Sequence, residues 1–159
     1  MQALIVYASK HGCTEKCAMK LMEKLKGQID LASLKAKPKI NFDKYNTVII
    51  GGSIHAGRIQ KRVKEFCGKH ADQLLTKKLG LFLCCMEESD TARKQFDEAF
   101  PEDLRNHAKA TGLFGGEFNF EKMNAIERAI IRKIAKPDQS ISKIDEEAIQ
   151  KFIEDLNST

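Results

Sequence analysis

A short polar loop near the N-terminus contains the residue types that bind a phosphate group. Its members are Ser9, Lys10, His11, Gly12, Cys13 and Thr14. Hydroxyl groups flank a glycine that allows close approach of the backbone, and the helical pattern that follows supplies N–H groups and a dipole that favour a dianion. The loop lacks the Gly-Lys-Ser/Thr of a Walker A motif and the GxGxxG of dinucleotide-binding folds. It therefore predicts a phosphate site of another kind, with a plain strand-to-helix turn as the alternative.

Apolar runs alternate with helical patterns along the chain. Runs that are apolar at consecutive positions are typical of strands buried on both faces, and they predict strands at about residues 3–8, 29–34, 47–52, 79–86 and 109–114. Helical periodicity predicts helices at about 14–26, 60–70, 91–100, 121–136 and 145–156, with a loop at 137–142. The alternation predicts an α/β fold with a doubly wound, five-stranded parallel sheet of order 2-1-3-4-5 and helices on both faces. Ligands bind such a sheet at the carboxyl ends of its strands, which selects the loops after Ala8, Gly51 and Met86.

Composition is typical of a soluble globular domain. The chain has 159 residues, of which 42% are hydrophobic and 31% charged, enough for a single domain over residues 1–159 with one substantial core. The apolar runs are too short to span a bilayer, and the N-terminus lacks the basic and apolar regions of a signal peptide. We therefore expect a cytoplasmic protein. The formal net charge of +5 comes without a nucleic-acid recognition motif, so no nucleic-acid partner is expected.

Five cysteines are spread over the chain without the spacing of a disulfide framework. They are Cys13, Cys17, Cys67, Cys84 and Cys85. Neither the i,i+4 pair at Cys13 and Cys17 nor the adjacent pair at Cys84 and Cys85 matches a common zinc or redox motif. We interpret all five as small buried residues in a reducing compartment, and we predict no metal site.

Three parts of the sequence resemble a known family. Residues 5–14, Ile-Val-Tyr-Ala-Ser-Lys-His-Gly-Cys-Thr, are similar to the FMN phosphate-binding loop of the flavodoxin superfamily. The stretch from Gly51 to Gly57, with Phe66, His70 and a segment that starts at Gly115, is similar to the group of bacterial menaquinone-dependent protoporphyrinogen oxidases. The resemblance extends from residue 1 to about residue 156 and implies a flavodoxin-like fold.

The resemblance implies that FMN is the cofactor and that the first loop holds its phosphate. It also implies that two segments border the isoalloxazine ring: Ser53, Ile54, His55, Ala56 and Gly57 in one, and Cys84, Cys85, Met86 and Glu87 in the other. Flavodoxins commonly stack aromatic side chains on this ring, whereas this chain has no Trp, and its tyrosines Tyr7 and Tyr45 lie outside these segments. We therefore expect weaker FMN binding and a ring that is more open to a substrate.

The implied activity is that of an FMN-dependent oxidoreductase that oxidises a porphyrinogen in heme biosynthesis and passes the electrons to a quinone such as menaquinone. Basic residues around the loops fit such a carboxylate-bearing substrate or an acidic partner. They are Lys10, His11, Arg58, Lys61, Arg62 and Lys64. A solvated helix face is the alternative for the last four. No catalytic acid or base is identified, although His11 and His55 lie in the predicted loops.

Residues 121–136 show a basic amphipathic pattern that fits two roles. Met123, Ile126, Ile130 and Ile134 form one helical stripe, and five basic residues against two acidic ones leave a charge of +3. Such a helix can lie on the anionic inner face of the cell membrane, where a lipid-soluble quinone is met, or it can pack on the sheet. Phe118 and Phe120, just before it, can cover the cofactor or belong to the core.

Two other functions fit the same sequence. A flavodoxin-type electron-transfer protein would carry single electrons on FMN, but the positive charge, the missing aromatic residues and the segment after the fifth strand disfavour it. A partner-binding module that has lost FMN is disfavoured by the intact first loop. The sequence does not indicate an oligomeric state.

Overall fold

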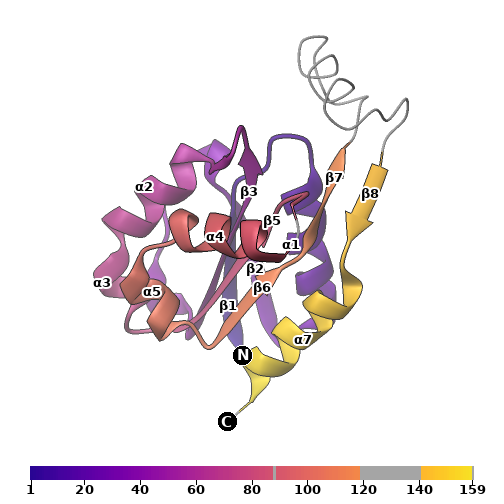
Figure 1. Ribbon diagram of the computed structural model, residues 1–159. Coiled ribbons are helices and arrows are strands. Elements are labelled where there is room, and N and C mark those ends of the chain that lie inside the picture. The colour runs from indigo at the N-terminus through magenta and orange to yellow at the C-terminus, as the bar shows by residue number, and fades with distance from the viewer. Residues whose placement is uncertain (88, 119–140, 159) are drawn as a thin grey trace.

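Five parallel strands form the central sheet of the computed structural model, which describes residues 1–87, 89–118 and 141–158 (Figure 1). They are β1 (Gln2–Tyr7), β2 (Gln28–Ser33), β3 (Thr47–His55), β5 (Lys78–Cys84) and β6 (Ala110–Leu113). Their order is β2-β1-β3-β5-β6, and each neighbouring pair is parallel. This confirms the predicted α/β fold and the predicted order 2-1-3-4-5, because β5 and β6 are the fourth and fifth strands of the parallel sheet.

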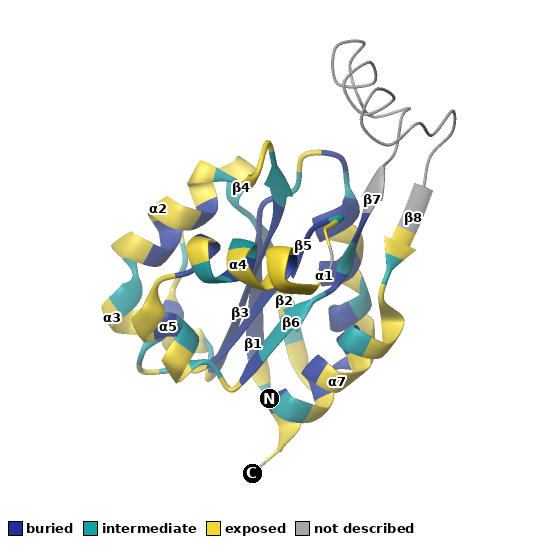
Figure 2. Cartoon of the chain, viewed as in Figure 1, coloured by how far each residue is buried: buried dark blue, intermediate teal, exposed yellow. Residues whose placement is uncertain are grey.

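Helices cover both faces of this sheet. On one face lie α1 (Cys13–Lys24) and α7 (Glu146–Asn157), and on the other lie α2 (Lys61–Lys69), α3 (Ala71–Leu74), α4 (Ser89–Ala99) and α5 (Glu102–His107) (Figure 1). The short 3₁₀ helices η1 (Leu34–Ala36) and η2 (Phe42–Lys44) connect β2 to β3. A hydrophobic cluster fills each interface between sheet and helices. The central strands β1, β3 and β5 are buried over nearly their whole length (Figure 2), which explains why their sequences are apolar at consecutive positions.

The last helix, α7, begins at a capping aspartate and packs its apolar side on the sheet. The helix predicted at about 145–156 is α7, which begins after Asp145; the Asp145 carboxylate accepts a hydrogen bond from the Ala148 N–H at 3.0 Å. Its apolar stripe is buried against the sheet through Ile149, Phe152, Ile153 and Leu156. Gly80 in β5 makes room for this stripe, because a Cβ there would lie 2.6 Å from Phe152 Cζ.

An antiparallel hairpin follows the fifth strand and was not predicted. It consists of β7 (Gly115–Phe118) and β8 (Ile141–Ile144), so the predicted loop at 137–142 is wrong for residues 141 and 142. Both strands are short and far apart in the sequence, so no local pattern indicates that they pair. The Asp145 N–H donates to the Phe114 carbonyl at 2.9 Å, which brings the two ends of this segment together. The predicted helix at 121–136 and Phe120 lie outside the described residues.

Smaller differences concern the ends of the elements. β3 continues to His55, past the predicted end at residue 52, and pairs antiparallel with the short strand β4 (Arg58–Ile59). The helix α4 ends before Pro101, as predicted, and α3 and α5 are short helices that the sequence pattern did not indicate. No helix in the described part of the chain is long and apolar enough to cross a membrane.

Candidate cofactor site

The first loop forms a tight turn between β1 and α1. Gly12 has a φ of 93°, in the left-handed region that glycine adopts without strain. Its N–H donates to Ser9 Oγ at 3.1 Å, and its carbonyl accepts the first hydrogen bond of α1 from the Lys16 N–H at 2.9 Å. The Ala8 N–H donates to the Gly51 carbonyl at 3.2 Å. The loop therefore lies between β1 and β3, where the strand order reverses.

Thr14 has a fully buried hydroxyl that has no hydrogen-bond partner among the described residues. Leaving a buried polar group without a partner costs about 1–3 kcal/mol. An oxygen atom of a ligand would satisfy this hydroxyl, and the first N–H groups of α1 lie in the same turn, where the helix dipole favours an anion. The residues present in this loop therefore fit a phosphate group.

The second segment is held against the first loop by Gln60, the residue that precedes α2. Its Oε1 accepts from the Ser53 N–H at 2.8 Å, and its Nε2 donates to Ser53 Oγ at 2.7 Å and to the Ala8 carbonyl at 3.1 Å. Ser53 Oγ also lies 2.9 Å from His55 Nε2. One amide group thus joins the ends of β1 and β3. Sequence reasoning missed Gln60, because nothing distinguishes it from the other polar residues around α2.

Most of the second segment is strand rather than loop. Ser53, Ile54 and His55 are the last residues of β3, and only Ala56 and Gly57 form the turn to β4, with φ values of 51° and 77°. The rings of His11 and His55 meet edge to face, with centroids 5.5 Å apart, and His11 is buried. The structure therefore brings the first and second segments together, as the strand order predicted.

The third segment presents few side chains to a ligand. Cys84 and Cys85 are buried in the clusters on opposite faces of the sheet, so their side chains belong to the core. Hydrogen bonds with Cys13 and Cys17, with burial, raise the pKa of Cys84, and burial raises the pKa of Cys85. Of the other two residues of this segment, Met86 is half-buried and Glu87 is exposed.

The segment that begins β7 packs directly on this third segment. The Cys85 N–H donates to the Gly115 carbonyl at 2.8 Å. A Cβ on Gly116 would lie 2.6 Å from the Met86 sulfur, so the hairpin approaches this sulfur closely. The hairpin β7–β8 is therefore attached to the edge of the sheet that carries the predicted site.

Five basic residues surround a cavity of about 500 Å³ beside the first loop. They are Lys10, Lys35, Arg58, Lys61 and Arg62. Four of them were predicted, whereas Lys35 was not, because it comes from η1, after the neighbouring strand β2. His11 and Lys64, also predicted, do not line this cavity. A cavity of about 510 Å³ at the amino ends of β1 and β2 contains none of the predicted residues.

Comparisons with known proteins agree on the fold. The profile of the flavodoxin domain family matches residues 4–145, which include all three segments. The flavodoxin of Streptococcus pneumoniae TIGR4 superposes with a TM-score of 0.53 and 18% identity over 98% of this chain and 97% of that one. Flavodoxin 1 of Bacillus cereus superposes with a TM-score of 0.51 and 15% identity over 97% of this chain and 93% of that one.

A curated relative matches over a shorter stretch. Protoporphyrinogen IX dehydrogenase [quinone] of Escherichia coli K12 is 32% identical over 77 residues, which are 46% of this chain and 42% of that protein. The match thus spans less than half of either chain.

Proposed function

Because the chain belongs to the flavodoxin domain family and has its FMN-binding fold, we propose that it is an FMN-dependent oxidoreductase with the cofactor at the carboxyl edge of the sheet. The observation that carries this proposal is the buried Thr14 hydroxyl without a partner among the described residues, at the start of α1. With the N–H groups of the same turn, this hydroxyl would hold the FMN phosphate.

The residues proposed around the flavin ring are Ser53 to Gly57, Met86 and Glu87, with backbone groups of Cys84 and Cys85. FMN supplies the electron-accepting and electron-donating chemistry when it is bound. The chain's own residues orient it: Gln60 fixes Ser53 against the end of β1, and His55 is positioned by its hydrogen bond with the Ser53 hydroxyl. No side chain among the described residues stands out as an acid or a base.

We propose further that the substrate carries carboxylates, with a porphyrinogen as the leading candidate and a quinone as electron acceptor. One support is the partial match with the quinone-linked dehydrogenase of Escherichia coli. The other is the cavity beside the first loop, because five basic side chains around it favour an anionic ligand.

An anaerobic turnover assay tests this assignment. Protoporphyrinogen is the electron donor and a menaquinone analogue the acceptor, with FMN-loaded protein as catalyst. We expect oxidation of the donor to be matched by reduction of the analogue. If an FMN-loaded sample does not turn over, the porphyrinogen assignment is overturned while FMN binding stands. The other candidate function, carriage of single electrons, would instead appear as two separate one-electron steps in a reductive titration.

We also propose that the protein meets its quinone at the inner face of the cell membrane, through residues 121–136. The +3 charge and the apolar stripe of this segment support the proposal. Sedimentation with vesicles tests it: binding to anionic phosphatidylglycerol vesicles and not to neutral phosphatidylcholine vesicles is expected. Replacing Arg128, Arg132 and Lys133 by Gln should abolish that binding. If the variant sediments with anionic vesicles as much as the unaltered protein does, residues 121–136 are not the membrane contact.

A further inference from the structure

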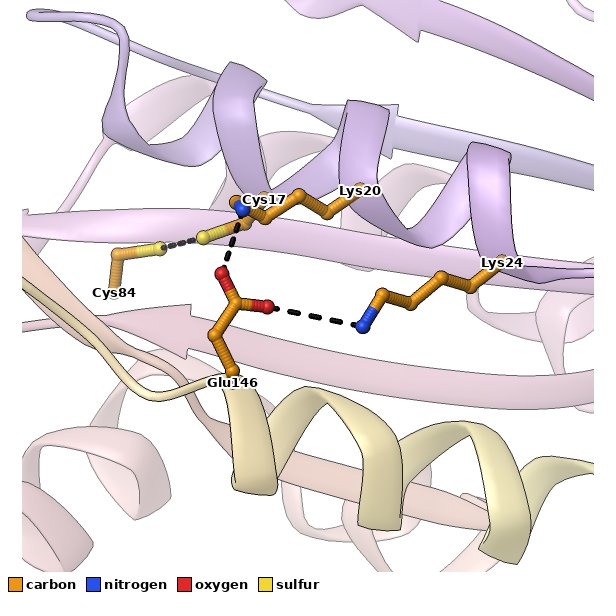
Figure 3. A network of polar contacts seen from close by, with 5 residues as sticks. All are labelled: Cys17, Lys20, Lys24, Cys84 and Glu146. Carbon is orange, nitrogen blue, oxygen red and sulfur yellow. Dashed lines mark hydrogen bonds and ion pairs between the residues drawn. The ribbon is translucent and has the colours of Figure 1, made fainter.

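Three buried cysteines form a cluster beneath the first loop. Cys13 and Cys17 lie one turn apart on α1, and Cys84 ends β5, so helix and sheet bring the three together. Their sulfur atoms all lie within 4.8 Å of one another, and the sulfurs of Cys17 and Cys84 are 3.6 Å apart (Figure 3). The exposed fractions of the residues are 7%, 0% and 2%. None of the three forms a disulfide bond.

The spacing of these sulfurs matches that of a three-thiolate metal site. Sulfur atoms at about 2.3 Å from a common ion, in a trigonal arrangement, lie about 4 Å from one another. This value falls between the 3.6 Å that separates Cys17 and Cys84 and the 4.8 Å that bounds the whole cluster. In the described part of the chain, no other group of three potential ligand side chains comes this close.

We propose that Cys13, Cys17 and Cys84 bind one thiophilic d¹⁰ metal ion, of the class of Zn²⁺, Cd²⁺ and Cu⁺. Three thiolates select soft ions of this kind over hard oxygen-binding ions. Each thiol that binds releases its proton to solvent, so a divalent ion replaces three protons and the complex carries one negative charge. No oxidant or reductant takes part in this step.

Hydrogen bonds with Cys13, together with burial, raise the pKa of Cys17 and Cys84, so a metal ion has to displace their protons. Two weaker positive potentials act in the opposite direction. The N-terminus of α1 lies at Cys13, where the helix dipole stabilises negative charge. The Lys20 ammonium acts on Cys17 electrostatically and is itself paired with Glu146 (Figure 3). Cys13 is the least buried member of the cluster and the one that belongs to the first loop.

The cysteine cluster also adjoins the proposed cofactor site. This link between metal and cofactor rests on the proposed function, whereas the proposed metal site does not depend on it. The backbone of Cys13 starts α1 next to Thr14, while its side chain belongs to the buried cluster. A metal ion would therefore tie the first loop to the end of β5. We expect bound metal to change the affinity of the loop for FMN.

Titration with Cd²⁺ tests the metal site. The full chain is kept anaerobic in a phosphine reductant, without FMN, and the sulfur-to-cadmium charge-transfer absorption is followed. We expect one ion per chain and loss of the band in Cys17→Ser and Cys84→Ser. The matched controls Cys67→Ser and Cys85→Ser remove equally buried thiols outside the cluster and should keep it. If the charge-transfer band is lost in the control variants as well, or if the unaltered protein shows no band, the proposal is overturned.

A second measurement does not depend on whether the variants fold. X-ray absorption of the cadmium-loaded, unaltered protein should show a shell of three sulfur neighbours, and a shell of mainly oxygen or nitrogen overturns the proposal. FMN binding is measured on the same preparation by fluorescence quenching. Metal binding without FMN binding contradicts only the proposed function, and FMN binding without metal binding contradicts only the metal site.

Discussion

The side-chain amide of Gln60 hydrogen-bonds Ser53 twice, accepting from its N–H at 2.8 Å and donating to its hydroxyl at 2.7 Å. The same amide reaches the Ala8 carbonyl, so one residue outside the predicted segments sets the distance between two of them. The positions of the first two cofactor segments therefore depend on a residue that is not itself proposed to touch the cofactor.

Replacing Gln60 by Ala should lower both the stability of the protein and its affinity for FMN. The change leaves the Ser53 N–H and the Ala8 carbonyl without their partner, at a cost of about 1–3 kcal/mol in the free energy of unfolding. We also expect the FMN dissociation constant to rise about tenfold, corresponding to about 1.4 kcal/mol. Urea unfolding and fluorescence quenching measure the two effects. The control is Gln150→Ala on the exposed face of α7, and equal losses in both variants would contradict the role of Gln60.

Replacing Thr14 by Val separates cofactor binding from stability. The variant removes a buried hydroxyl that has no partner among the described residues, so the cofactor-free protein should be unchanged or stabilised by about 1 kcal/mol. FMN should bind about ten to a hundred times more weakly, because a hydrogen bond to a charged group contributes about 1.5–3 kcal/mol.

Thr47→Val is the matched control for Thr14. The Thr47 hydroxyl is equally buried but donates to Asn46 Oδ1 at 2.8 Å, so its loss should lower stability and leave FMN affinity unchanged. Unaltered FMN affinity in Thr14→Val would place the phosphate elsewhere.

Neutralising the basic cavity should affect the substrate and not the cofactor. In Arg58→Gln/Arg62→Gln we expect the KM for a carboxylate-bearing donor to rise about tenfold, since each lost charge weakens attraction to the anion. The effect should shrink as salt screens the remaining charges. The exposed Lys69→Gln, on the same helix as Arg62 but outside the cavity, serves as control. A change in FMN affinity instead of KM would assign these residues to the cofactor.

The ion pair between Lys20 and Glu146 predicts a dependence of stability on acid pH. The hydrogen bond from Lys20, 2.6 Å from the carboxylate, lowers the pKa of Glu146 below its ordinary 4.5 (Figure 3). Because the pKa of Glu146 is lower in the folded protein than in the unfolded chain, the ion pair stabilises the fold fully at pH values above the unfolded-state pKa. This stabilisation is lost as the pH falls through the folded-state pKa. The difference in unfolding free energy between the unaltered protein and Glu146→Gln should therefore vanish in strong acid.

A double-mutant cycle with Lys20→Met isolates the pair. At neutral pH the two single changes should be less than additive, and at acid pH they should become additive. Coupling that is the same at both pH values would show that the carboxylate charge is not responsible.

The sheet was predictable because its three central strands are buried on both faces. Consecutive apolar residues in β1, β3 and β5 identify such strands, and the alternation with helices leaves few possible orders. The hairpin β7–β8 was not predictable, because its pairing joins residues far apart in the chain. That residues 1–159 form one domain stays a prediction.

The site was predictable where a local turn defines it and not where packing does. Gly12 and Thr14 stand in a recognisable strand-to-helix turn, which indicates an anion site. Gln60 gave no local signal, since its importance comes from the approach of β1 to β3. Likewise, the spacing of Cys13 and Cys17 places them on one side of α1, but only the packing of α1 on β5 adds Cys84 and makes a set of three ligands.

The hydrogen bond between Asp145 and Phe114 has a consequence for how this protein can change over evolutionary time. The chain leaves the sheet after Phe114, and Asp145 lies beside the same residue, so the two ends of the intervening stretch are held together. Lengthening, shortening or exchanging this stretch leaves the register of the five parallel strands intact and changes the loop-closure entropy only slowly with length. The stretch between the two ends can therefore change in length while the parallel sheet is kept, provided that the contacts of the first residues of β7 with Cys85 and Met86 are maintained.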